Sequence, residues 1–457
     1  MLNDPIFKEK YSNGIQKLLD KGYAIKNNST PAGKTWYLPH FGVQHPMKKN
    51  LRIVFDCSAK FNNLCLNDLL LQGPDLTNML LGVLLRFRLG KVAFMADIEA
   101  MFHQVRVSPE HQTYLKFLWW PDANLNLPPE DYQMSVHLFG AVSSPSCANF
   151  ALRQTIVESS LEETEEGQTI MNNFYVDDLL KSVDGIQIAI ELIAKVHQLC
   201  GSGGFNLTKF VCNNKEVLNS VPQAKRSDEQ TKDIGKSETI ERALGVHWCL
   251  ENDTLGFRVN LQDTPLTRRG ILSTISSVYD PLGIAGPFLL KGRKILQQIT
   301  ALRDGWDTKV PEDLAQLWMS WRDNLPKLKN ISIKRCYKPN NFDKVQNMSL
   351  HIFSDASEVG YGVACYLRQV DIEGRISVSL ALGKSRVAPI KSVTIPRLEL
   401  TAAQLSVKFG ALLKEELDQR LVKDIYWSDS KITLGYIMND VRRFRVFVAN
   451  HCPKIRA

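Results

Sequence analysis

The sequence comprises 457 residues and carries a formal net charge of +8 at pH 7. This length predicts two or three domains with substantial cores, and the basic balance favours an anionic partner, nucleic acid first. The nine cysteines form no CxxC pair and no zinc-spaced cluster, which argues against a disulfide scaffold and a zinc module. Neither a signal peptide nor an apolar stretch of membrane-spanning length is present. We therefore expect a soluble, cytoplasmic protein without a membrane partner, with a virus-like particle or the nucleus as alternative locations.

The N-terminal region combines a helix with a basic strand. Apolar residues at helical spacing predict an exposed helix within residues 4–26. Lys48 and Lys49 precede an alternating strand at residues 51–56, and a basic cluster that enters a strand suits a sheet presenting Arg52 to an anion. A solvated strand edge is the alternative interpretation.

A helical pattern and a buried strand come next. Residues 66–89 place apolar side chains at helical spacing, and the continuous apolar run at residues 92–97 ends in Asp97. Such a run is typical of a central strand. An acid at its end requires a metal ion or a salt bridge, because an isolated buried charge is expensive. Alternating residues predict a further strand at 103–107.

Two adjacent carboxylates interrupt an apolar run in the middle of the chain. Residues 174–180 indicate a strand, a tight turn and a second strand, with Asp177 and Asp178 beside the turn. Like charges in a semi-buried site repel each other, and a divalent cation removes that repulsion. Mg²⁺ is suited to this task because it prefers one or two carboxylates together with substrate phosphate oxygens.

Further helices and a polar segment flank the acid pair. A turn-rich loop at residues 138–145 opens a predicted helix at 147–159, for which Ser144 is the expected cap. Another helix is predicted at residues 186–199. Residues 219–241 are polar and predict a surface loop or hairpin.

The region from residue 260 to 341 has a helical character of its own. It contains three tryptophans, and basic residues are among its side chains: Trp306, Trp318, Trp321, Arg268, Arg269, Lys291, Arg293 and Lys294. We interpret this region as a helical connection that lies along a phosphate backbone. A solvated helical linker is the alternative.

The last segment alternates strands with a helix and again brings acids to element ends. The expected elements are strands at 350–355, 360–366 and 376–382, an amphipathic helix at 398–412 and a strand at 424–429. Asp355 and Asp429 end two of these strands, and Glu399 stands near the start of the helix.

The acids thus form two sets in chain order. The first is Asp97, Asp177 and Asp178, and the second is Asp355, Glu399 and Asp429. Carboxylates that converge from separate elements hold two divalent ions, which stabilise the attacking and leaving oxygens of a phosphoryl displacement. Carboxylates are hard ligands, so Mg²⁺ or Mn²⁺ is the expected cofactor.

Several motifs carry a resemblance to a known family. Four groups of residues resemble the ordered motifs of reverse transcriptases: Phe94–Asp97 with Phe102, Leu138–Pro145, Tyr175–Asp178 and Leu244–Trp248. The terminal segment resembles ribonuclease H. Other stretches resemble, more narrowly, the polyprotein of Pao/BEL-type LTR retrotransposons: Trp36–His40, Arg52–Ser58, Leu66–Pro74, Tyr279–Gly283, Ile395–Leu400 and Arg443–Asn450.

The resemblance implies a mixed α+β architecture in three parts. Residues 1–255 would form the fingers and palm of a right-hand polymerase, and residues 256–345 a helical thumb and connection. Residues 346–457 would form a ribonuclease H-like α/β domain. The implied activity is RNA-directed DNA polymerisation, with an RNA or DNA template, a primer and dNTPs as partners.

The resemblance also implies roles for the first acid set. Asp97 and Asp177 would be the principal metal ligands, and Asp178 would complete the site. The 3′-hydroxyl of the primer would attack the α-phosphorus of the dNTP, and pyrophosphate would leave.

Four further residues would bind the incoming nucleotide. Arg52 matches the fingers arginine on the triphosphate, with Lys48 or Lys49 as a second contact. Phe102 matches the aromatic residue that excludes a 2′-hydroxyl. Gly140 matches the glycine that lets the backbone approach the nucleotide and template. Lys209 is the candidate general acid for pyrophosphate.

At the second site, Asp355, Glu399 and Asp429 match three carboxylates with which ribonuclease H cleaves the RNA strand of an RNA–DNA hybrid. A fourth acid normally lies on a later segment, so we expect a truncated domain with weak nuclease activity. A protease and an integrase are expected to either side in the intact polyprotein.

Three other interpretations remain open. The same fold could be a catalytically inactive remnant that binds nucleic acid. A metal-dependent phosphohydrolase of small substrates would need a compact pocket and no basic stretch. A calcium module is disfavoured because no EF-hand spacing occurs. The sequence does not predict the oligomeric state.

Overall fold

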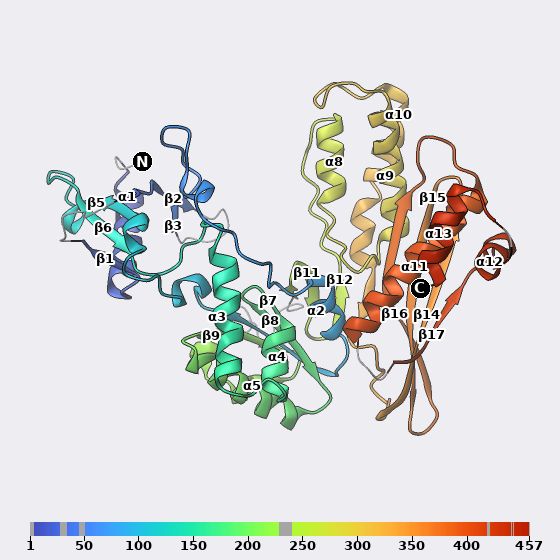
Figure 1. The fold of residues 1–457 in the computed structure, drawn as a ribbon, viewed down its shortest axis with the longest axis horizontal. Helices are drawn as coiled ribbons and strands as arrows, with labels where there is room; N and C mark the ends of the chain where they lie inside the picture. Colours follow the sequence, from blue (N-terminus) through green and yellow to red (C-terminus); the bar gives the residue numbers. More distant parts are fainter. Residues whose placement is uncertain are drawn as a thin grey trace. The chain divides into compact units, whose positions relative to one another are not determined.

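The computed structural model describes residues 4–27, 34–44, 51–227, 240–417, 421–439, 441 and 443–456. Helices and strands are mixed along this part of the chain (Figure 1). The chain divides into two compact units. Unit 1 is composed of Met1–Asn78, Ala96–Leu179 and Leu192–Thr208. Unit 2 is composed of Met79–Met95, Leu180–Glu191 and Lys209–Ala457.

Unit 1 begins with helix α1 (Pro5–Asp20), which starts where its sequence provides a cap. The Asp4 carboxylate accepts hydrogen bonds from the backbone N–H groups of Ile6 and Phe7 in the first turn. Pro5 has no backbone N–H that would need a partner there. The helix is shorter than the predicted range 4–26, because Gly22 adopts a φ of +67° shortly after Asp20. The next residues form strand β1 (Ala24–Lys26).

Two small sheets lie in the N-terminal part of unit 1. In the first sheet, β2 (His40–Gln44) pairs antiparallel with β3 (Leu51–Phe55). The second sheet contains β1, β6 (Glu130–Met134) and β5 (Lys116–Trp119) in the order β1-β6-β5. Ile15, Phe117 and Met134 are fully buried in the core between α1 and these strands. Arg52 lies on β3 as predicted, whereas Lys48 and Lys49 lie outside the described residues.

Two predicted elements of this region take a different form. Residues 103–107 do not form a strand: Met101–Gln104 is a 3₁₀ turn (η2), entered through Ala100 at a φ of +48°. The helical pattern at 66–89 yields only the short turn η1 (Leu66–Asp68) and helix α2 (Leu80–Arg86). Gly73 at φ +76°, followed by a proline, interrupts the helix between them.

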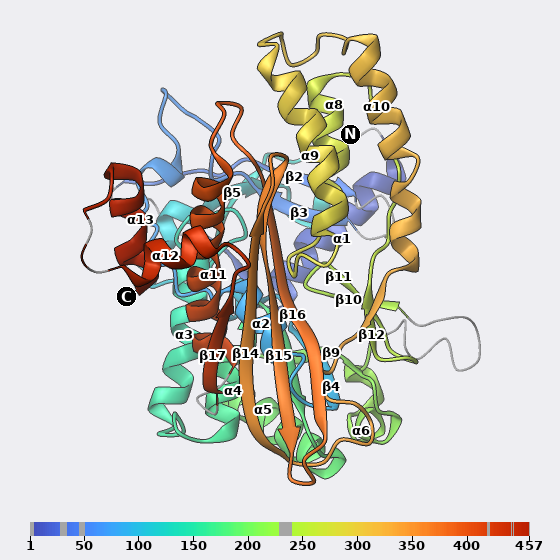
Figure 2. The ribbon, with the colours of Figure 1, turned by 90° about the vertical axis from the view of Figure 1, so that its right-hand side faces the viewer.

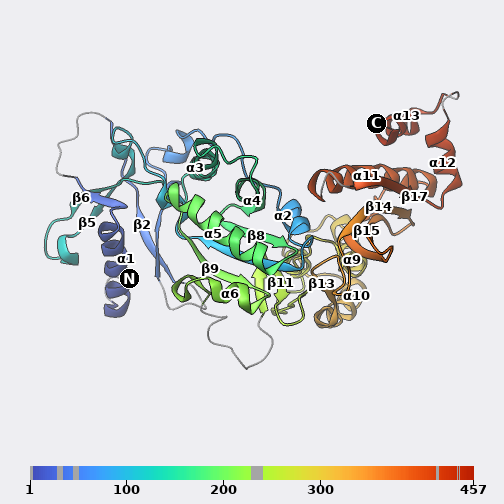
Figure 3. The same cartoon turned by 90° about the horizontal axis from the view of Figure 1, so that it is seen from below.

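The acid pair lies at a turn of a four-stranded sheet with the order β7-β8-β4-β9. Its strands are β7 (Phe174–Tyr175), β8 (Asp178–Val183), β4 (Val92–Ile98) and β9 (Leu207–Cys212). Figure 3 labels two of these strands, β8 and β9. The strand, turn and strand predicted at 174–180 are confirmed, because Tyr175 pairs with Asp178 across a two-residue turn. Three helices precede and follow this turn in the chain: α3 (Ser144–Glu158), α4 (Glu165–Asn173) and α5 (Ile186–Ser202). The N-cap of α3 is Ser143, one residue before the predicted Ser144.

Unit 2 contains a four-stranded antiparallel sheet and a group of three helices. The short helix α6 (Lys215–Ser220) comes before this sheet in the chain. The strands of the sheet have the order β10-β11-β12-β13. They are β10 (Ile240–Ala243), β11 (Val246–Cys249), β12 (Thr254–Gly256) and β13 (Ser332–Lys334). Figure 2 shows α8 (Arg268–Ser276), α9 (Gly286–Ala301) and α10 (Glu312–Arg322) side by side. Trp318 and Trp321 are buried in their shared core, so these two tryptophans stabilise the helical group. That this region lies along a phosphate backbone stays a prediction.

The last part of unit 2 is a sheet with the order β16-β15-β14-β17. Its strands are β14 (Val345–Ala356), β15 (Gly360–Asp371), β16 (Ile376–Val387) and β17 (Leu421–Trp427). β14, β15 and β16 are antiparallel neighbours, whereas β17 runs parallel to β14. Alternate residues of β14 are buried beneath helix α11 (Ile395–Leu417), which confirms the predicted strands and amphipathic helix.

Two short helices end the described chain, α12 (Lys431–Met438) and α13 (Val446–Arg456). Val448 and Cys452 of α13 pack against Leu400 of α11. None of the helices in the described part of the chain has the length and apolar character that a membrane span requires.

Candidate functional site

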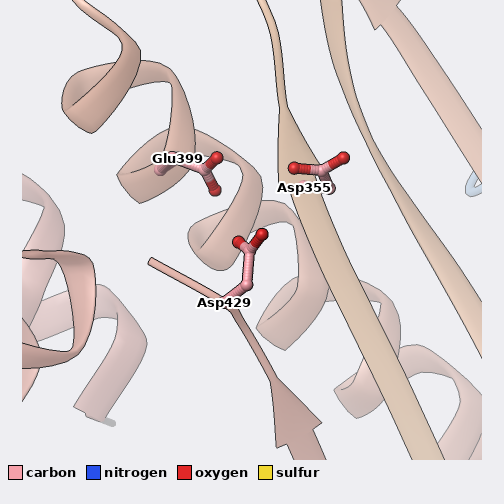
Figure 4. A group of neighbouring side chains, drawn as sticks. All are labelled: Asp355, Glu399 and Asp429. Carbon is pink, nitrogen blue, oxygen red and sulfur yellow. The ribbon is translucent and has the colours of Figure 1, made fainter. Parts of the chain in front are cut away.

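The acids of the terminal sheet meet in space. Asp355, Glu399 and Asp429 each offer a carboxylate oxygen, and these oxygens all lie within 4.8 Å of one another. Figure 4 shows that the three side chains converge from a strand, a helix and the segment beyond a second strand. Asp355 and Asp429 are exposed, whereas Glu399 is 6% exposed. The structure therefore gathers the whole second acid set that the sequence predicts.

Strand register explains this convergence. β14 and β17 run parallel, with Phe353 opposite Trp427. Asp355 and Asp429 each follow two residues later, so the two acids reach the same end of the sheet. Glu399 lies in the first turns of α11, the helix that packs on β14. The backbone N–H of Ala356 donates to Glu399 Oε1 at 3.3 Å and ties the helix to the strand end.

The environment of Glu399 fits a divalent cation. Burial raises the pKa of this carboxyl, and the charges of Asp355 and Asp429 raise it further, against the lowering effect of the Ala356 N–H. Its second oxygen, Oε2, is buried and has no hydrogen-bond partner. A buried carboxylate oxygen without a donor is unfavourable, and a metal ion would satisfy it and neutralise the repulsion of the three acids. The oxygen donor set is the one that Mg²⁺ or Mn²⁺ prefers.

The first acid set is adjacent along the backbone. The N–H of Ile98, next to Asp97, donates to the carbonyl oxygen of Asp177 at 2.9 Å. Val176 precedes this aspartate with a φ of +56°, a strained conformation for a β-branched residue. Strained backbone of this kind persists where the surrounding structure enforces it, frequently at functional sites. The strand end at Asp97 and the aspartate turn therefore lie side by side.

The three carboxylates of this set are not gathered as closely as those of the second set. Within the described residues, the group formed by Asp355, Glu399 and Asp429 is the one in which three acidic, histidine or cysteine ligands approach within 4.8 Å. Asp97, Asp177 and Asp178 form no such group. A Mg²⁺ site commonly uses one or two carboxylates and takes its other ligands from water and substrate phosphates. A metal site at Asp97 and Asp177 stays a prediction.

The predicted nucleotide-binding residues of unit 1 have clear positions. Phe102 lies on η2 and contacts Phe139, with ring centroids 4.6 Å apart. Gly140 has a φ of +108°, and a Cβ there would come within 3.1 Å of the carbonyl oxygen of Phe55. Gly140 is thus required both for its left-handed backbone and for close approach to the end of β3. Arg52 is exposed on the same strand.

Lys209 lies on β9 in unit 2, with an exposed side chain and a φ of +53°. A non-glycine residue with this φ inside a strand marks a local irregularity. The role of Lys209 as a general acid stays a prediction.

Most of the basic residues of the helical region have intramolecular contacts. Arg268 lies over the Trp306 ring at 3.9 Å, and Arg269 forms a two-point ion pair with Asp307. Arg293 donates to the carbonyl oxygen of Ser385, and Lys294 to the side chain of Gln297. Their positive charge remains, but these side chains are partly committed to the fold.

Sequence reasoning missed two residues near the predicted nucleotide site. Phe139 contacts Phe102, and Asn67 holds the loop that carries Phe139 and Gly140: Asn67 Nδ2 donates to the Gly140 carbonyl at 3.0 Å, and Asn67 Oδ1 accepts the Val142 N–H at 3.1 Å. An aromatic residue directly before the predicted glycine was the available signal for Phe139. No local pattern singles out Asn67, which lies more than seventy residues away in the chain.

Comparisons with known proteins bear on both sites. Residues 267–430 match the model of a family described as the Pao retrotransposon-like RNaseH-like domain. Comparison with curated proteins found no match.

Three solved structures of foamy viral protease-reverse transcriptase share the fold. The first, a dRH form in complex with double-stranded DNA, has a TM-score of 0.60 and 15% identity over 94% of this chain. A complex with an RNA/DNA hybrid has a TM-score of 0.57 and 14% identity over 98% of this chain. Another double-stranded DNA complex has a TM-score of 0.56 and 16% identity over 97% of this chain. This chain spans 64%, 52% and 79% of the lengths of those three chains.

These likenesses define the class of fold: a mixed α/β chain similar to retroviral reverse transcriptase with an RNase H-like domain. The family match over residues 267–430 points further, to Pao retrotransposons. It confirms the resemblance to the pol polyprotein of Pao/BEL-type retroelements that the motifs predicted.

Proposed function

We propose that this chain is a retroelement reverse transcriptase with two metal-dependent activities. One is cleavage of the RNA strand of an RNA–DNA hybrid at Asp355, Glu399 and Asp429. The other is RNA-directed DNA synthesis at Asp97, Asp177 and Asp178. The observation that carries the proposal is the convergence of Asp355, Glu399 and Asp429 around a buried, unpartnered carboxylate oxygen. Metal-assisted hydrolysis of a phosphodiester uses such a group of hard ligands.

At the nuclease site, the three acids would hold the metal ions and orient the substrate. Asp355 and Asp429, exposed at the sheet end, face the solvent from which substrate and water enter. Glu399, anchored by the Ala356 N–H, fixes the inner side of the cluster. Bound Mg²⁺ or Mn²⁺ would supply charge neutralisation and activation of water or hydroxyl at both sites.

DNA synthesis is the second activity, and a separate observation favours it. The Asp97 strand end and the strained Val176–Asp177 turn are joined by a backbone hydrogen bond. Phe102 and Gly140 are linked in turn through Phe139, which contacts the first and precedes the second. We infer that Phe102 meets the sugar of a dNTP and that Arg52 binds its triphosphate. The primer 3′-hydroxyl then attacks the α-phosphorus and pyrophosphate leaves.

The finer assignments belong to the same proposal. Residues 1–255 serve as fingers and palm, 256–345 as thumb and connection, and 346–457 as the nuclease domain. The partners are a primed RNA or DNA template, dNTPs and the RNA–DNA hybrid. Two of the solved neighbours are complexes with double-stranded DNA and one is a complex with an RNA/DNA hybrid, which supports nucleic acid as the partner class.

Reciprocal variants test the two activities in one preparation. Asp177→Asn should lower primer extension on an RNA template by on the order of 10²-fold or more, because a ligand that stabilises developing charge is lost. It should leave hybrid cleavage unchanged. Asp355→Asn should do the reverse. Each variant is thus the control for the other, and both assays are run with Mg²⁺ and with Mn²⁺.

Two outcomes would contradict the proposal. Primer extension that Asp177→Asn leaves intact would assign the activity to a contaminant. Salt-dependent binding of a primer–template without extension or cleavage under either metal would identify an inactive nucleic-acid-binding remnant, since phosphate contacts alone produce a steep salt dependence.

A further inference from the structure

An aromatic cluster borders the loop that carries Gly140. The Phe139 ring lies 4.6 Å from Phe102, between centroids, at an interplanar angle of 45°. His103 meets Phe139 edge-on at 5.3 Å, and Tyr23 contacts His103 at 5.0 Å. Phe139 therefore lies between Phe102 and the remainder of the cluster.

The loop beneath Phe139 is held firmly. Asn67 bonds both sides of it, through the Gly140 carbonyl and the Val142 N–H. The φ of +108° at Gly140 and its close approach to the Phe55 carbonyl leave little room for movement. Yet the Phe139 side chain is 46% exposed. A large aromatic side chain, half-exposed on a tightly fixed loop, suggests a functional contact.

Phe102 needs such a neighbour if it is to discriminate between sugars. A ring excludes a 2′-hydroxyl by steric overlap, and overlap is effective only when the ring cannot rotate away. Phe102 is partly exposed on the short turn η2, so its own helix does not enclose it. Phe139 provides a tilted ring contact of a kind that restricts a neighbouring aromatic side chain. His103 supports it from the other direction as a neutral group, since burial and, to a lesser degree, the charge of nearby Lys21 together lower the pKa of its imidazole to about 4.

We propose that Phe139 is a positioning residue that holds the Phe102 ring against the sugar of the incoming nucleotide. The Phe102–Phe139 pair, rather than Phe102 alone, then sets the preference for deoxynucleoside over ribonucleoside triphosphates. This inference rests on the proposed DNA synthesis.

The test compares single-nucleotide incorporation of dATP and ATP opposite uridine by the full chain. Phe139→Ala should raise the ATP/dATP ratio of kcat/KM roughly two- to tenfold, the effect expected from loss of one aromatic contact. The change should come mainly from a lower KM for ATP. Phe139→Leu, which keeps bulk, should change the ratio less. Phe150→Ala, at an exposed phenylalanine of α3 in the same unit, is the matched control and should leave the ratio unchanged.

Two further measurements separate positioning from a general structural effect. Phe102→Ala should raise the ratio more than Phe139→Ala, and the double variant should add nothing to Phe102→Ala, because Phe139 acts through Phe102. Binding of dATP and ATP to a complex with a dideoxy-terminated primer should show the same change in relative affinity without turnover. Thermal melting confirms that each variant is folded.

The outcomes distinguish this inference from the proposed function. Incorporation of dATP by the wild type, with an ATP/dATP ratio that Phe139→Ala and Phe139→Leu leave unchanged, would overturn the role of Phe139 alone. Full additivity of the Phe102 and Phe139 variants would overturn it as well. Absence of any dATP incorporation by the wild type would overturn the polymerase proposal and this inference together.

Discussion

Glu399 combines burial, like-charged neighbours and an unpartnered oxygen in a single side chain. Its pKa is raised above the usual glutamate value by burial and by Asp355 and Asp429. An acid with a raised pKa in the folded state binds its proton more tightly when folded. Its charged form therefore weakens folding, and stability is lost as the pH rises from the ordinary glutamate range through the raised value.

We predict that Glu399→Gln stabilises the metal-free protein at pH 7. The substitution removes a charge that burial and two neighbouring acids make unfavourable. It should raise the Tm by roughly 2–4 °C, the shift that about 1 kcal/mol produces in a domain of 150–250 residues. Mg²⁺ should raise the Tm of the wild type, because it binds the folded state, and should have little effect on the variant. Thermal melts at pH 4.5 and pH 7, with and without Mg²⁺, measure both effects.

Glu415→Gln provides the control on the same helix, since Glu415 is exposed on α11 and lies outside the acid cluster. It should leave the Tm and the Mg²⁺ response unchanged. A Mg²⁺ response that survives in Glu399→Gln would remove this residue from the metal site. Mg²⁺ should bind more weakly as the pH falls, because protons compete for the cluster.

At the scale of elements, the segment Tyr279–Gly283 has a structural explanation. Asp280 accepts the N–H groups of Ile284 and Ala285 just before α9, at 2.9 and 2.8 Å. Gly283 then lets the chain touch β16, where the Gly383 N–H donates to the Leu282 carbonyl at 2.8 Å. This motif of the Pao/BEL resemblance therefore joins the helical group to the terminal sheet within unit 2.

Gly283→Ala should destabilise the protein strongly. Gly283 has a φ of +71°, and a Cβ there would lie 1.8 Å from the Gly383 carbonyl oxygen. The left-handed backbone costs an L-residue roughly 1–2 kcal/mol, and the steric overlap adds a similar amount or more. Gly374→Ala is the matched control: its φ is +79°, but no atom lies within 4 Å of the added Cβ.

Urea denaturation of the two variants separates the two contributions. Gly374→Ala should lose only the backbone part, roughly 1–2 kcal/mol. If Gly283→Ala were no less stable than Gly374→Ala, the close approach of Gly283 to β16 would have no energetic weight.

At the scale of the whole chain, an ion pair between a fully buried arginine and a partly buried aspartate ties together distant segments of unit 2. Arg335 is fully buried, and its guanidinium donates to both carboxylate oxygens of Asp253 at 2.7 and 2.8 Å. Arg88, also buried, donates to the carbonyls of Arg335 and Leu380. These contacts connect the segment after α2, the β12–β13 region and strand β16.

Asp253→Asn should cost about 3–5 kcal/mol of unfolding free energy, because it leaves the buried Arg335 charge without a counter-charge. Asp307→Asn removes an exposed ion pair with Arg269 and should cost far less, because solvent screens the two charges. Chemical denaturation of both variants, followed by circular dichroism, tests the difference. Equal losses would mean that the Arg335–Asp253 pair contributes no more than a surface pair.

The division into two units also separates the two proposed chemistries. Asp97, Asp177 and Asp178 belong to unit 1, and Asp355, Glu399 and Asp429 belong to unit 2. The reciprocal variants of the activity test therefore alter one unit each. This is why a loss of both activities in either variant would indicate misfolding rather than lost catalysis.

Much of the architecture was predictable because it depends on near neighbours in the chain. Apolar alternation predicted β14 and β15, helical spacing predicted α11, and the acids at their ends were visible as interruptions of apolar runs. The turn between β7 and β8 followed from two acids inside such a run. These features follow from side-chain periodicity, which the order of residues alone determines.

Tertiary structure decided what depends on residues far apart in the chain. Only the parallel register of β14 with β17 brings Asp355 beside Asp429, and only the packing of α11 buries Glu399 there. The left-handed turn at Ala100 replaced a predicted strand, and the helical core took up Trp318 and Trp321. The sequence by itself determined which carboxylates were available. Their convergence required long-range packing, because the favourable contacts that offset charge repulsion and backbone strain come from distant segments.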